Sequence, residues 1–245
     1  MKKNQKILLI SPNSRYLIKY RKDMYHVKEG HIDLSKIKKF GEKIKSSNGT
    51  EFVVIEPSFF DLIKKTKRGP QIILPKDAGT IISYSGIGTG SKVIDAGTGS
   101  GWMAAFLARV VGSKGKVVTY EKSEQNYSVS NSNFKDLKLK NIKNKLGDVY
   151  SGIKEKNFDA IILDLAEPWK IPSIKQNVKT GGFIVCYLPQ VSQIQEFTKF
   201  AESNNILIER IIEVSERPWT FDGRISRPKS QQIGHTAFLI FSRNL

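Results

Sequence analysis

Four acidic side chains stand at or near the ends of short apolar segments in the second part of the chain. Short apolar runs bounded by glycine and polar residues are typical of buried strands. When such strands run parallel in a doubly wound sheet, their carboxyl ends converge on one crevice. We therefore expect these carboxylates to lie close together. They are Asp95 in SKVIDAG (91–97), Glu121 in GKVVTYE (115–121), Asp148 in KNKLGD (143–148) and Asp164 in NFDAIILDL (157–165).

The first of these segments runs into VIDAGTGSG, a turn that contains Gly97, Gly99 and Gly101. A glycine turn between a parallel strand and a helix lets a ligand lie against backbone N–H groups at the helix N-terminus. A dinucleotide fingerprint needs another small residue where Trp102 stands, and the chain contains no GxxxxGK[ST] phosphate loop. The turn therefore predicts a ligand site of another kind.

The carboxylates around this turn favour a cationic ligand over a diphosphate. Glu121 is placed to accept hydrogen bonds from both hydroxyls of a ribose, and Asp148 to accept one from an exocyclic amine such as adenine N6. A single acid at such a position is more often a helix cap or a surface carboxylate. Acids at successive strand ends instead indicate a shared site.

The stretch DLAEPW (164–169) places an acid and an aromatic ring together at the end of a strand. A carboxylate at Asp164 can accept a hydrogen bond from the amine of a nucleobase, and an aromatic ring can stack on that base. Trp169 has two interpretations, stacking on a base or packing under the loop, and packing is the commoner fate of a tryptophan. Glu167 either faces the ligand or holds the loop through backbone N–H groups.

The elements that position these residues alternate between strand and helix, which predicts an α/β fold with a doubly wound, mostly parallel sheet. Two last strands are expected as an antiparallel pair around a long polar loop. The expected helices are 75–87, 100–112, 123–137, 171–182 and 191–204, and the remaining strands are 183–189, 206–219 and 235–243.

Residues 1–67 differ in pattern and predict a small, basic, β-rich domain ahead of the α/β domain at 68–245. KILLI (6–10) and FVVIEP (52–57) indicate strands, and the Asn-Gly pair in SSNGT (46–50) indicates a turn. The segment RGP at 68–70 marks the boundary.

Charge is the strongest global signal, with a formal net charge of +17 and 40 Lys and Arg among 245 residues. Residues 1–70 hold 17 of these bases against 7 acids. Such an excess favours a polyanionic partner, because bases that contact phosphates release condensed counterions. No run of apolar residues is long enough to span a membrane, and the basic start lacks a signal-peptide pattern. One cysteine, Cys186, excludes a multi-cysteine metal site and suits a reducing cytoplasm.

Several motifs, in order over about residues 68–243, resemble the tRNA (adenine-N1)-methyltransferase family, whose members modify adenine 58, and some also adenine 57, of the TΨC loop. DLAEPW and GHTAFL are more specific than the glycine turn. The resemblance implies the seven-stranded sheet of S-adenosylmethionine-dependent methyltransferases, a small extra N-terminal domain and a homotetramer. The motifs are QIILPKD (71–77), VIDAGTGSG, YE (120–121), GD (147–148), LDLAEPW, YLPQ (187–190) and GHTAFL (234–239).

The same resemblance assigns roles to individual residues and no metal. Leu74 stands where many members carry a tyrosine, and Trp102 and Met103 are bulky where small residues are frequent. Asp164 is the expected catalytic residue. The expected cofactor contacts are Asp95, Gly97, Gly99, Ser100, Gly101, Trp102, Met103, Glu121, Asn126, Asp148 and Asp164.

Six further residues are candidates for contacts with tRNA, each beside a structural alternative. Trp169 either stacks on a base or packs under the loop, and Tyr187 either reaches into the crevice or caps it. A lone histidine such as His235 is more often a structural residue than a base. The remaining three, in RPWTFDGRISRP (217–228), either contact RNA backbone or form a solvated loop, and they are Arg217, Arg224 and Arg227.

Two other functions fit the same scaffold. One is a methyltransferase acting on a protein or small molecule, such as the family that methylates damaged aspartates, against which DLAEPW and the positive charge argue. The other is a non-catalytic tRNA-binding subunit, against which the intact glycine turn and Asp164 argue.

Overall fold

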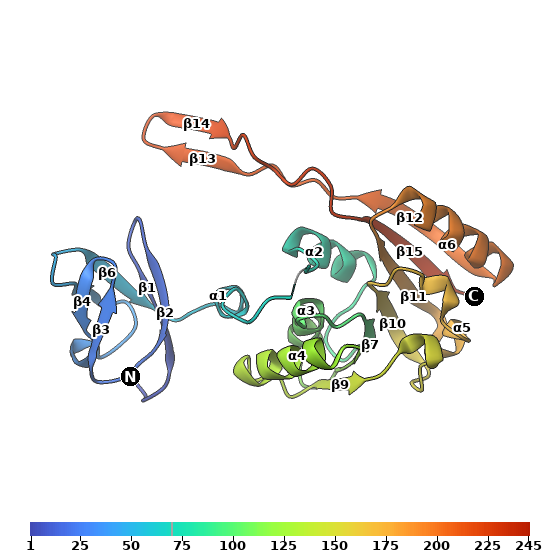
Figure 1. Ribbon diagram of the computed structural model, residues 1–245, viewed down its shortest axis with the longest axis horizontal. Coiled ribbons are helices and arrows are strands. Elements are labelled where there is room, and N and C mark those ends of the chain that lie inside the picture. The colour runs from blue at the N-terminus through green and yellow to red at the C-terminus, as the bar shows by residue number, and fades with distance from the viewer. Residues whose placement is uncertain (70) are drawn as a thin grey trace. The chain divides into compact units, whose positions relative to one another are not determined.

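A computed structural model describes residues 1–69 and 71–245, so Pro70 of the RGP boundary signal lies outside the described residues. The chain divides into two compact units, Met1–Thr66 and Lys67–Leu245 (Figure 1). Each is described separately. Within the described residues, no helix is long and apolar enough to cross a membrane.

The first unit is built on a four-stranded antiparallel sheet in the order β2-β1-β6-β5, with the hairpin β3-β4 beside it. Its core holds fully buried Ile7, Leu9 and Phe52, and the expected turn closes between β5 and β6 through a Gly49 N–H to Ser46 carbonyl bond of 2.9 Å. Its elements are β1 (Lys6–Ile10), β2 (Arg15–Lys19), β3 (Met24–Val27), β4 (Gly30–Asp33), η1 (Leu34–Lys36), β5 (Lys43–Lys45), β6 (Glu51–Ile55) and α1 (Phe59–Ile63).

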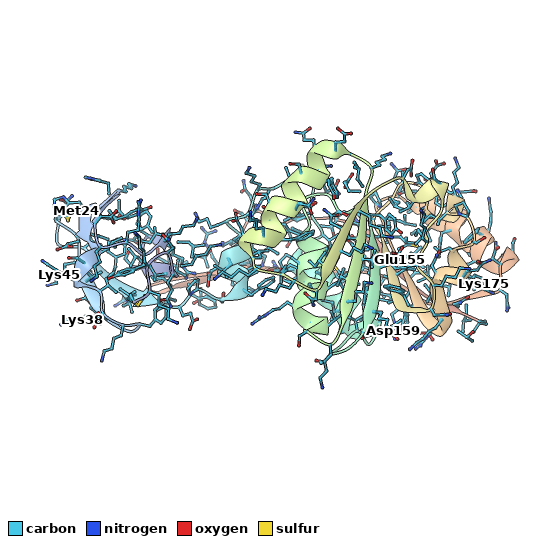
Figure 2. The ribbon with its side chains drawn as sticks, turned by 90° about the horizontal axis from the view of Figure 1, so that it is seen from below. Met24, Lys38, Lys45, Glu155, Asp159 and Lys175 are labelled. Atoms are coloured by element: carbon cyan, nitrogen blue, oxygen red, sulfur yellow. The ribbon has the colours of Figure 1, made fainter. Side chains whose placement is uncertain are left out.

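Basic side chains cover the outside of this unit. Lys38 and Lys45 are exposed and extend outward (Figure 2). The unit therefore combines an apolar sheet core with a cationic surface.

The second unit contains a seven-stranded sheet in the order β12-β15-β11-β10-β7-β8-β9. The neighbours from β11 to β9 pair parallel, while β15 pairs antiparallel with both β11 and β12. This is the expected doubly wound α/β fold. The strands are β7 (Lys92–Ala96), β8 (Lys116–Glu121), β9 (Ile142–Leu146), β10 (Phe158–Leu163), β11 (Val178–Leu188), β12 (Ile206–Glu213) and β15 (Phe238–Asn244).

Helices cover both faces of this sheet (Figure 1). The alternation of side chains along each strand sends one set toward α2, α3 and α4 and the other toward α5 and α6. Ile94 and Ile184, for example, pack in one cluster with Phe197 of α6. The helices are α2 (Pro75–Tyr84), α3 (Trp102–Val111), α4 (Glu124–Asp136), α5 (Ile174–Asn177) and α6 (Val191–Ser203), with the 3₁₀ turns η2 (Val149–Ser151) and η3 (Pro168–Lys170).

The helix expected at 171–182 was wrong for most of its length. Only α5 is helical there, and β11 begins at Val178. Val178 pairs with Phe158 of β10, and the Asn177 amide donates to the carbonyls of Ile153 and Glu155 at 3.0 and 2.7 Å. Pairing with a neighbouring strand outweighs the local helical pattern.

The polar loop between the two last strands also differs from expectation. The strand expected at 206–219 ends at Glu213, and a two-stranded hairpin of β13 (Trp219–Asp222) and β14 (Ile225–Pro228) follows. Asp222 pairs with Ile225 across a two-residue turn, a common hairpin geometry when glycine comes first. The hairpin projects away from the sheet (Figure 1).

Candidate active site

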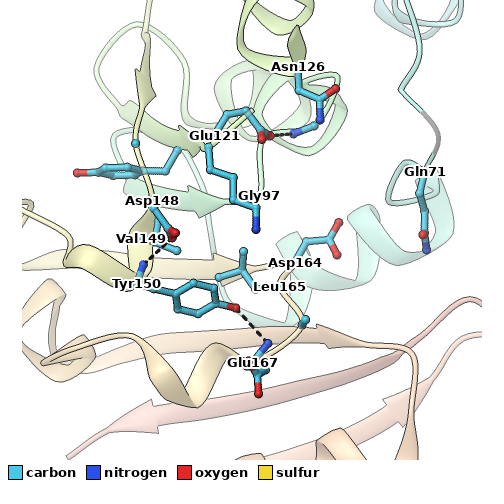
Figure 3. Close-up of a pocket in the computed structure, with 15 residues that line it drawn as sticks. Gln71, Gly97, Glu121, Asn126, Asp148, Val149, Tyr150, Asp164, Leu165 and Glu167 are labelled. Carbon is cyan, nitrogen blue, oxygen red and sulfur yellow. Dashed lines mark hydrogen bonds between the residues drawn. The ribbon is translucent and has the colours of Figure 1, made fainter. Parts of the chain in front are cut away.

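A pocket of about 430 Å³ opens at the carboxyl ends of the parallel strands. This is the edge at which doubly wound sheets bind ligands. Figure 3 shows its lining side chains converging from β8, α4, η2 and the segment after β10. Three of the four acids predicted to share a site do line it, namely Glu121, Asp148 and Asp164.

Glu121 is held in place by backbone donors. Its side chain accepts hydrogen bonds from the N–H of Gly99 at 2.8 Å and of Ser123 at 2.9 Å. Glu121 is only 7% exposed. Each carboxylate oxygen has a further lone pair, so Glu121 can accept two more bonds from a ligand without moving.

The glycine turn brings two backbone segments into contact. Gly97 has a φ of +93°, and a β-carbon there would overlap the carbonyl oxygen of Asp164. Gly101 has a φ of +86°, and a β-carbon there would lie 2.5 Å from the ring of Phe134. Glycine is required at both positions by backbone conformation and by space.

A small cavity of about 30 Å³ adjoins the pocket and shares Gln71, Gly97, Gly99 and Asp164 with it. Its other lining residues are Ile72, Ile73, Thr98, Ser100, Trp102 and Met103.

Two buried polar atoms at this cavity, Ser100 Oγ and Trp102 Nε1, have no hydrogen-bond partner among the described residues. Unpaired buried donors are costly and point to a missing partner. Together with the backbone N–H groups at the start of α3, they fit the carboxylate of an amino acid, as in S-adenosylmethionine.

Asp164 follows β10 directly. Its N–H donates to the carbonyl of Ala96 at 2.9 Å, which ties it to the end of β7. Burial raises the pKa of Asp164 to about 6, because a low-dielectric surrounding disfavours the charged carboxylate. The side chain is directed into the pocket (Figure 3).

Asp148 and Asn126 line the same pocket from η2 and from the first turn of α4. The Asp148 side chain accepts from the N–H of Tyr150 at 2.9 Å, which fixes it as the cap of η2. Both residues therefore line the predicted crevice, and their contacts with a cofactor stay a prediction.

The structure does not bring Asp95 to the pocket wall. Asp95 is 1% exposed within β7 and accepts a 2.6 Å hydrogen bond from the Thr119 hydroxyl. Burial, with smaller contributions from the charges of Asp164 and Glu121, raises the pKa of Asp95 to about 7. The strand's alternation points this side chain into the sheet interior, toward α3, rather than to the carboxyl edge.

Trp169 and Glu167 differ in where the structure places them. Trp169 packs against the buried cluster of the sheet and does not line the pocket. The Glu167 carboxylate pairs with Lys170 at 2.7 Å and caps no backbone N–H of η3. Glu167 still contributes to the pocket wall.

Tyr187 and His235 do not line the pocket either. Tyr187 is 2% exposed, and burial, followed by the charge of Asp77, raises its pKa to about 12. His235 joins Glu213, 2.5 Å from Nδ1, to the carbonyl of Pro189, 3.0 Å from Nε2. The Glu213 contact raises the pKa of His235. Contacts at both ring nitrogens favour the structural alternative, and a contact with tRNA stays a prediction.

The three candidate arginines also lie apart from the pocket. Arg227 belongs to β14, Arg224 to the turn before it and Arg217 to the segment that leads into β13. All three are exposed.

Sequence reasoning did not assign a role to several lining residues, among them Gln71, Lys122 and Tyr150. The Tyr150 hydroxyl accepts from the N–H of Glu167 at 3.2 Å, which joins η2 to the DLAEPW loop. Each stands beside a motif that was recognised: Gln71 opens QIILPKD, Lys122 follows Glu121 and Tyr150 comes shortly after Asp148. For Lys122 and Tyr150 the available signal was their position shortly after a strand, and for Gln71 it was its place in a recognised motif. No cluster of three or more metal-ligating side chains occurs within the described part of the chain.

Comparison with known proteins agrees with this geometry. Residues 57–224 match the sequence profile of the family described as tRNA methyltransferase complex GCD14 subunit. The tRNA (adenine(57)-N(1)/adenine(58)-N(1))-methyltransferase TrmI of Methanocaldococcus jannaschii is 32% identical, covering 97% of this chain and 94% of that protein.

Two solved structures are similar over the whole chain. A protein from Thermotoga maritima described as a SAM-dependent O-methyltransferase has a TM-score of 0.90 and 33% identity, covering 100% of this chain and 94% of that one. The tRNA (m1A58) methyltransferase TrmI of Aquifex aeolicus has a TM-score of 0.82 and 28% identity, covering 100% and 98%. The chain therefore belongs to the tRNA methyltransferase complex GCD14 subunit family, the tRNA (adenine-N1)-methyltransferases that its motifs resemble.

Proposed function

We propose that this protein transfers a methyl group from S-adenosylmethionine to N1 of adenine 58, and of adenine 57 where present, in the TΨC loop of tRNA. The observation that carries the proposal is the position of Asp164, a half-buried carboxylate in the same pocket as Glu121 and Asp148. The named activities of the Methanocaldococcus and Aquifex relatives support the substrate.

The methyl donor would be held along the edge of the sheet. The turn from Gly97 to Gly101, with Ser100 Oγ and Trp102 Nε1, fits its amino-acid part, and Met103 lines the same cavity. Glu121 would accept from the ribose hydroxyls. Asp148 and Asn126 would face the adenine. When bound, S-adenosylmethionine supplies a methyl group on a sulfonium centre, which is open to direct in-line displacement.

Asp164 would act on the acceptor base. Adenine N1 is neutral at pH 7 and needs no general base to remove a proton before it attacks. Methylation places positive charge on the N1–C6–N6 amidine, and a carboxylate that accepts from the N6 amine stabilises that charge as it develops. An adenine within a folded tRNA must first leave its stack to reach the pocket.

The charge of the chain supports a tRNA substrate. The formal net charge is +17, and the first unit carries exposed lysines such as Lys38 and Lys45. The exposed Arg217, Arg224 and Arg227 would contact RNA backbone away from the pocket rather than the target base. None of Trp169, Tyr187 and His235 lines the pocket. They would hold the segments around the substrate-binding side of the pocket in place and would not contact the target base.

A homotetramer is part of this proposal. The hairpin exposes large apolar side chains, with Trp219 at 51%, Phe221 at 78% and Ile225 at 54% exposure. A two-stranded ribbon with such side chains gains stability from packing against another chain. The single cysteine, which is buried, suits a reducing cytoplasm.

The test is a methyl-transfer assay with labelled S-adenosylmethionine and unmodified tRNA transcripts, in which adenine 58 is present or replaced. Digestion to nucleosides should yield label in 1-methyladenosine, lost with the base change and reduced steeply in Asp164→Ala. Label that survives the base change points to adenine 57. Cofactor binding without any transfer to tRNA would overturn the substrate.

A second candidate is O-methylation of a protein or small molecule, favoured by the description of the Thermotoga relative. Its acceptor would use the same pocket. Transfer to a carboxyl or hydroxyl acceptor, with none to tRNA, would support it.

A further inference from the structure

The first residues of the second unit lie directly on the glycine turn. Asn133, on the buried face of α4, is 3% exposed. Its amide oxygen accepts from the N–H of Lys67 at 3.0 Å, and its amide nitrogen donates to the carbonyls of Lys67 and Ser100, both at 2.8 Å. One side chain therefore binds both backbone polar groups of Lys67, its N–H and its C=O, and the carbonyl of Ser100 in the turn.

Two further contacts join the same segments. The guanidinium carbon of Arg68 lies 5.0 Å from the centre of the Trp102 ring. Gly69 lies so close that a β-carbon there would be 3.7 Å from the backbone nitrogen of Ser100. Residues 67–69, which we call the anchor segment, thus pack along Ser100 and Trp102.

The helix α4 also holds the turn from its other side. A β-carbon on Gly101 would meet Phe134 and, at 3.3 Å, Ser130, both of α4. The first turn of α4 carries Asn126 in the pocket wall. Asn133 thus belongs to a helix that supplies Asn126 to the pocket wall and packs against the glycine turn at Gly101, while its own side chain reaches the anchor segment.

These contacts give the turn and the anchor segment a common partner. A ligand that orders the turn around Ser100 also fixes the Ser100 carbonyl, which accepts one of the hydrogen bonds from the Asn133 side-chain amide. The same amide then holds Lys67 more firmly. Linkage is reciprocal, so an anchor segment held in place raises affinity for the ligand by the same factor.

We propose that Asn133 is a positioning residue that couples methyl-donor binding to the docking of the anchor segment. The inference rests on the proposed use of S-adenosylmethionine. It predicts that the bound donor protects the peptide bonds after Lys67 and Arg68, because proteolysis requires that segment to leave its hydrogen bonds.

The experiment is limited trypsin cleavage of the full chain, with and without saturating S-adenosylhomocysteine. Cleavage after Lys67 in the wild-type protein should slow by about fivefold or more with the ligand. In Asn133→Ala this protection should disappear, and calorimetry should show about tenfold weaker ligand binding. Asn131→Ala is the matched control, because Asn131 lies on the same helix, is exposed and bonds only to Asn144 at 3.1 Å among the hydrogen bonds described for its side chain.

Arg68→Ala gives a second, surface variant that leaves the core intact, since Arg68 is exposed. It should weaken ligand binding about threefold and reduce protection at Lys67. Equal protection in the wild-type protein, Asn133→Ala and Arg68→Ala would overturn the coupling while leaving the proposed function standing. Failure of the wild-type protein to bind S-adenosylhomocysteine would instead overturn the proposed function, and the coupling with it.

Discussion

The backbone of Gly97 packs against the carbonyl oxygen of Asp164, so that a β-carbon at position 97 would overlap that oxygen. The turn after β7 and the acid after β10 are therefore held in direct contact. The contact places the expected donor loop and the expected catalytic carboxylate in one pocket.

Substitution of Gly97 tests this contact. Gly97→Ala must push the turn away from Asp164, so we expect S-adenosylhomocysteine affinity, measured by calorimetry, to fall by at least about tenfold. Gly90→Ala is the control, because Gly90 has a similar φ of +91° but no atom within 4 Å of a β-carbon. It should cost about 1–2 kcal/mol of stability and leave binding unchanged. Equal affinities of the two variants would contradict the prediction.

The pH dependence of methyl transfer tests Asp164. Its pKa is raised to about 6, and only the ionised form stabilises a positively charged amidine. The single-turnover rate should therefore rise with pH through about 6 and then level. Asp164→Asn should lower the rate by about 100- to 1000-fold and remove this rise. A variant that keeps the same pH profile would assign it to another group.

Asp95 should make stability fall with rising pH. Its pKa is raised to about 7, so between the ordinary value of 3.8 and about 7 the folded protein binds more protons than the unfolded chain. Stability is then greatest at the acidic end of this window and is lost as pH rises through it, by at most about 1.4 kcal/mol per pH unit. Denaturant unfolding of Asp95→Asn should show a flatter profile between pH 5 and 8. An unchanged slope would argue against the buried carboxyl as its source.

A buried ion pair on α2 contacts both segments that join the β13–β14 hairpin to the sheet, one after β12 and the other before β15. Lys76 Nζ contacts Asp77 at 2.7 Å, the carbonyl of Val214 at 2.8 Å and the Thr236 hydroxyl at 2.7 Å, and the Lys76 and Asp77 side chains are 7% and 0% exposed. Asp77→Ala leaves a buried charge unpaired and should cost about 3–5 kcal/mol in denaturant unfolding.

The control is the exposed Lys199–Glu196 pair, for which Glu196→Ala should cost less than about 1 kcal/mol. Thr236→Val should cost about 1 kcal/mol. Similar losses for Asp77→Ala and Glu196→Ala would refute the importance of burial.

The hairpin tests the proposed assembly. Phe221 is 78% exposed, and Phe221→Glu places a charge where we expect an apolar contact between chains. If the wild-type protein is the tetramer that we propose, light scattering after size exclusion should show smaller particles for this variant than for the wild-type protein. Lys229→Glu, a charge change at an exposed site just after β14, should leave the mass unchanged. A tetramer that persists in Phe221→Glu would remove the hairpin from the interface.

The sequence alone determined much of the second unit. Alternating strands and helices, the glycine turn and the acids at strand ends reflect local periodicity and turn chemistry, which depend on near neighbours. They identified the sheet, Glu121, Asp148 and Asp164 as parts of one crevice, and the motif DLAEPW identified the family.

Tertiary structure decided the features that depend on distant partners. Val178 continues a strand because β10 lies beside it, and Asp95 leaves the crevice because the pleat turns its side chain into the sheet. Trp169 packs against the core, while Tyr150 and Gln71 reach the pocket through the tertiary packing of the segments that carry them. The bonds of Asn133 join residues 66 and 33 positions apart in the chain. Such contacts follow from packing between elements, and no local pattern in the sequence specifies them.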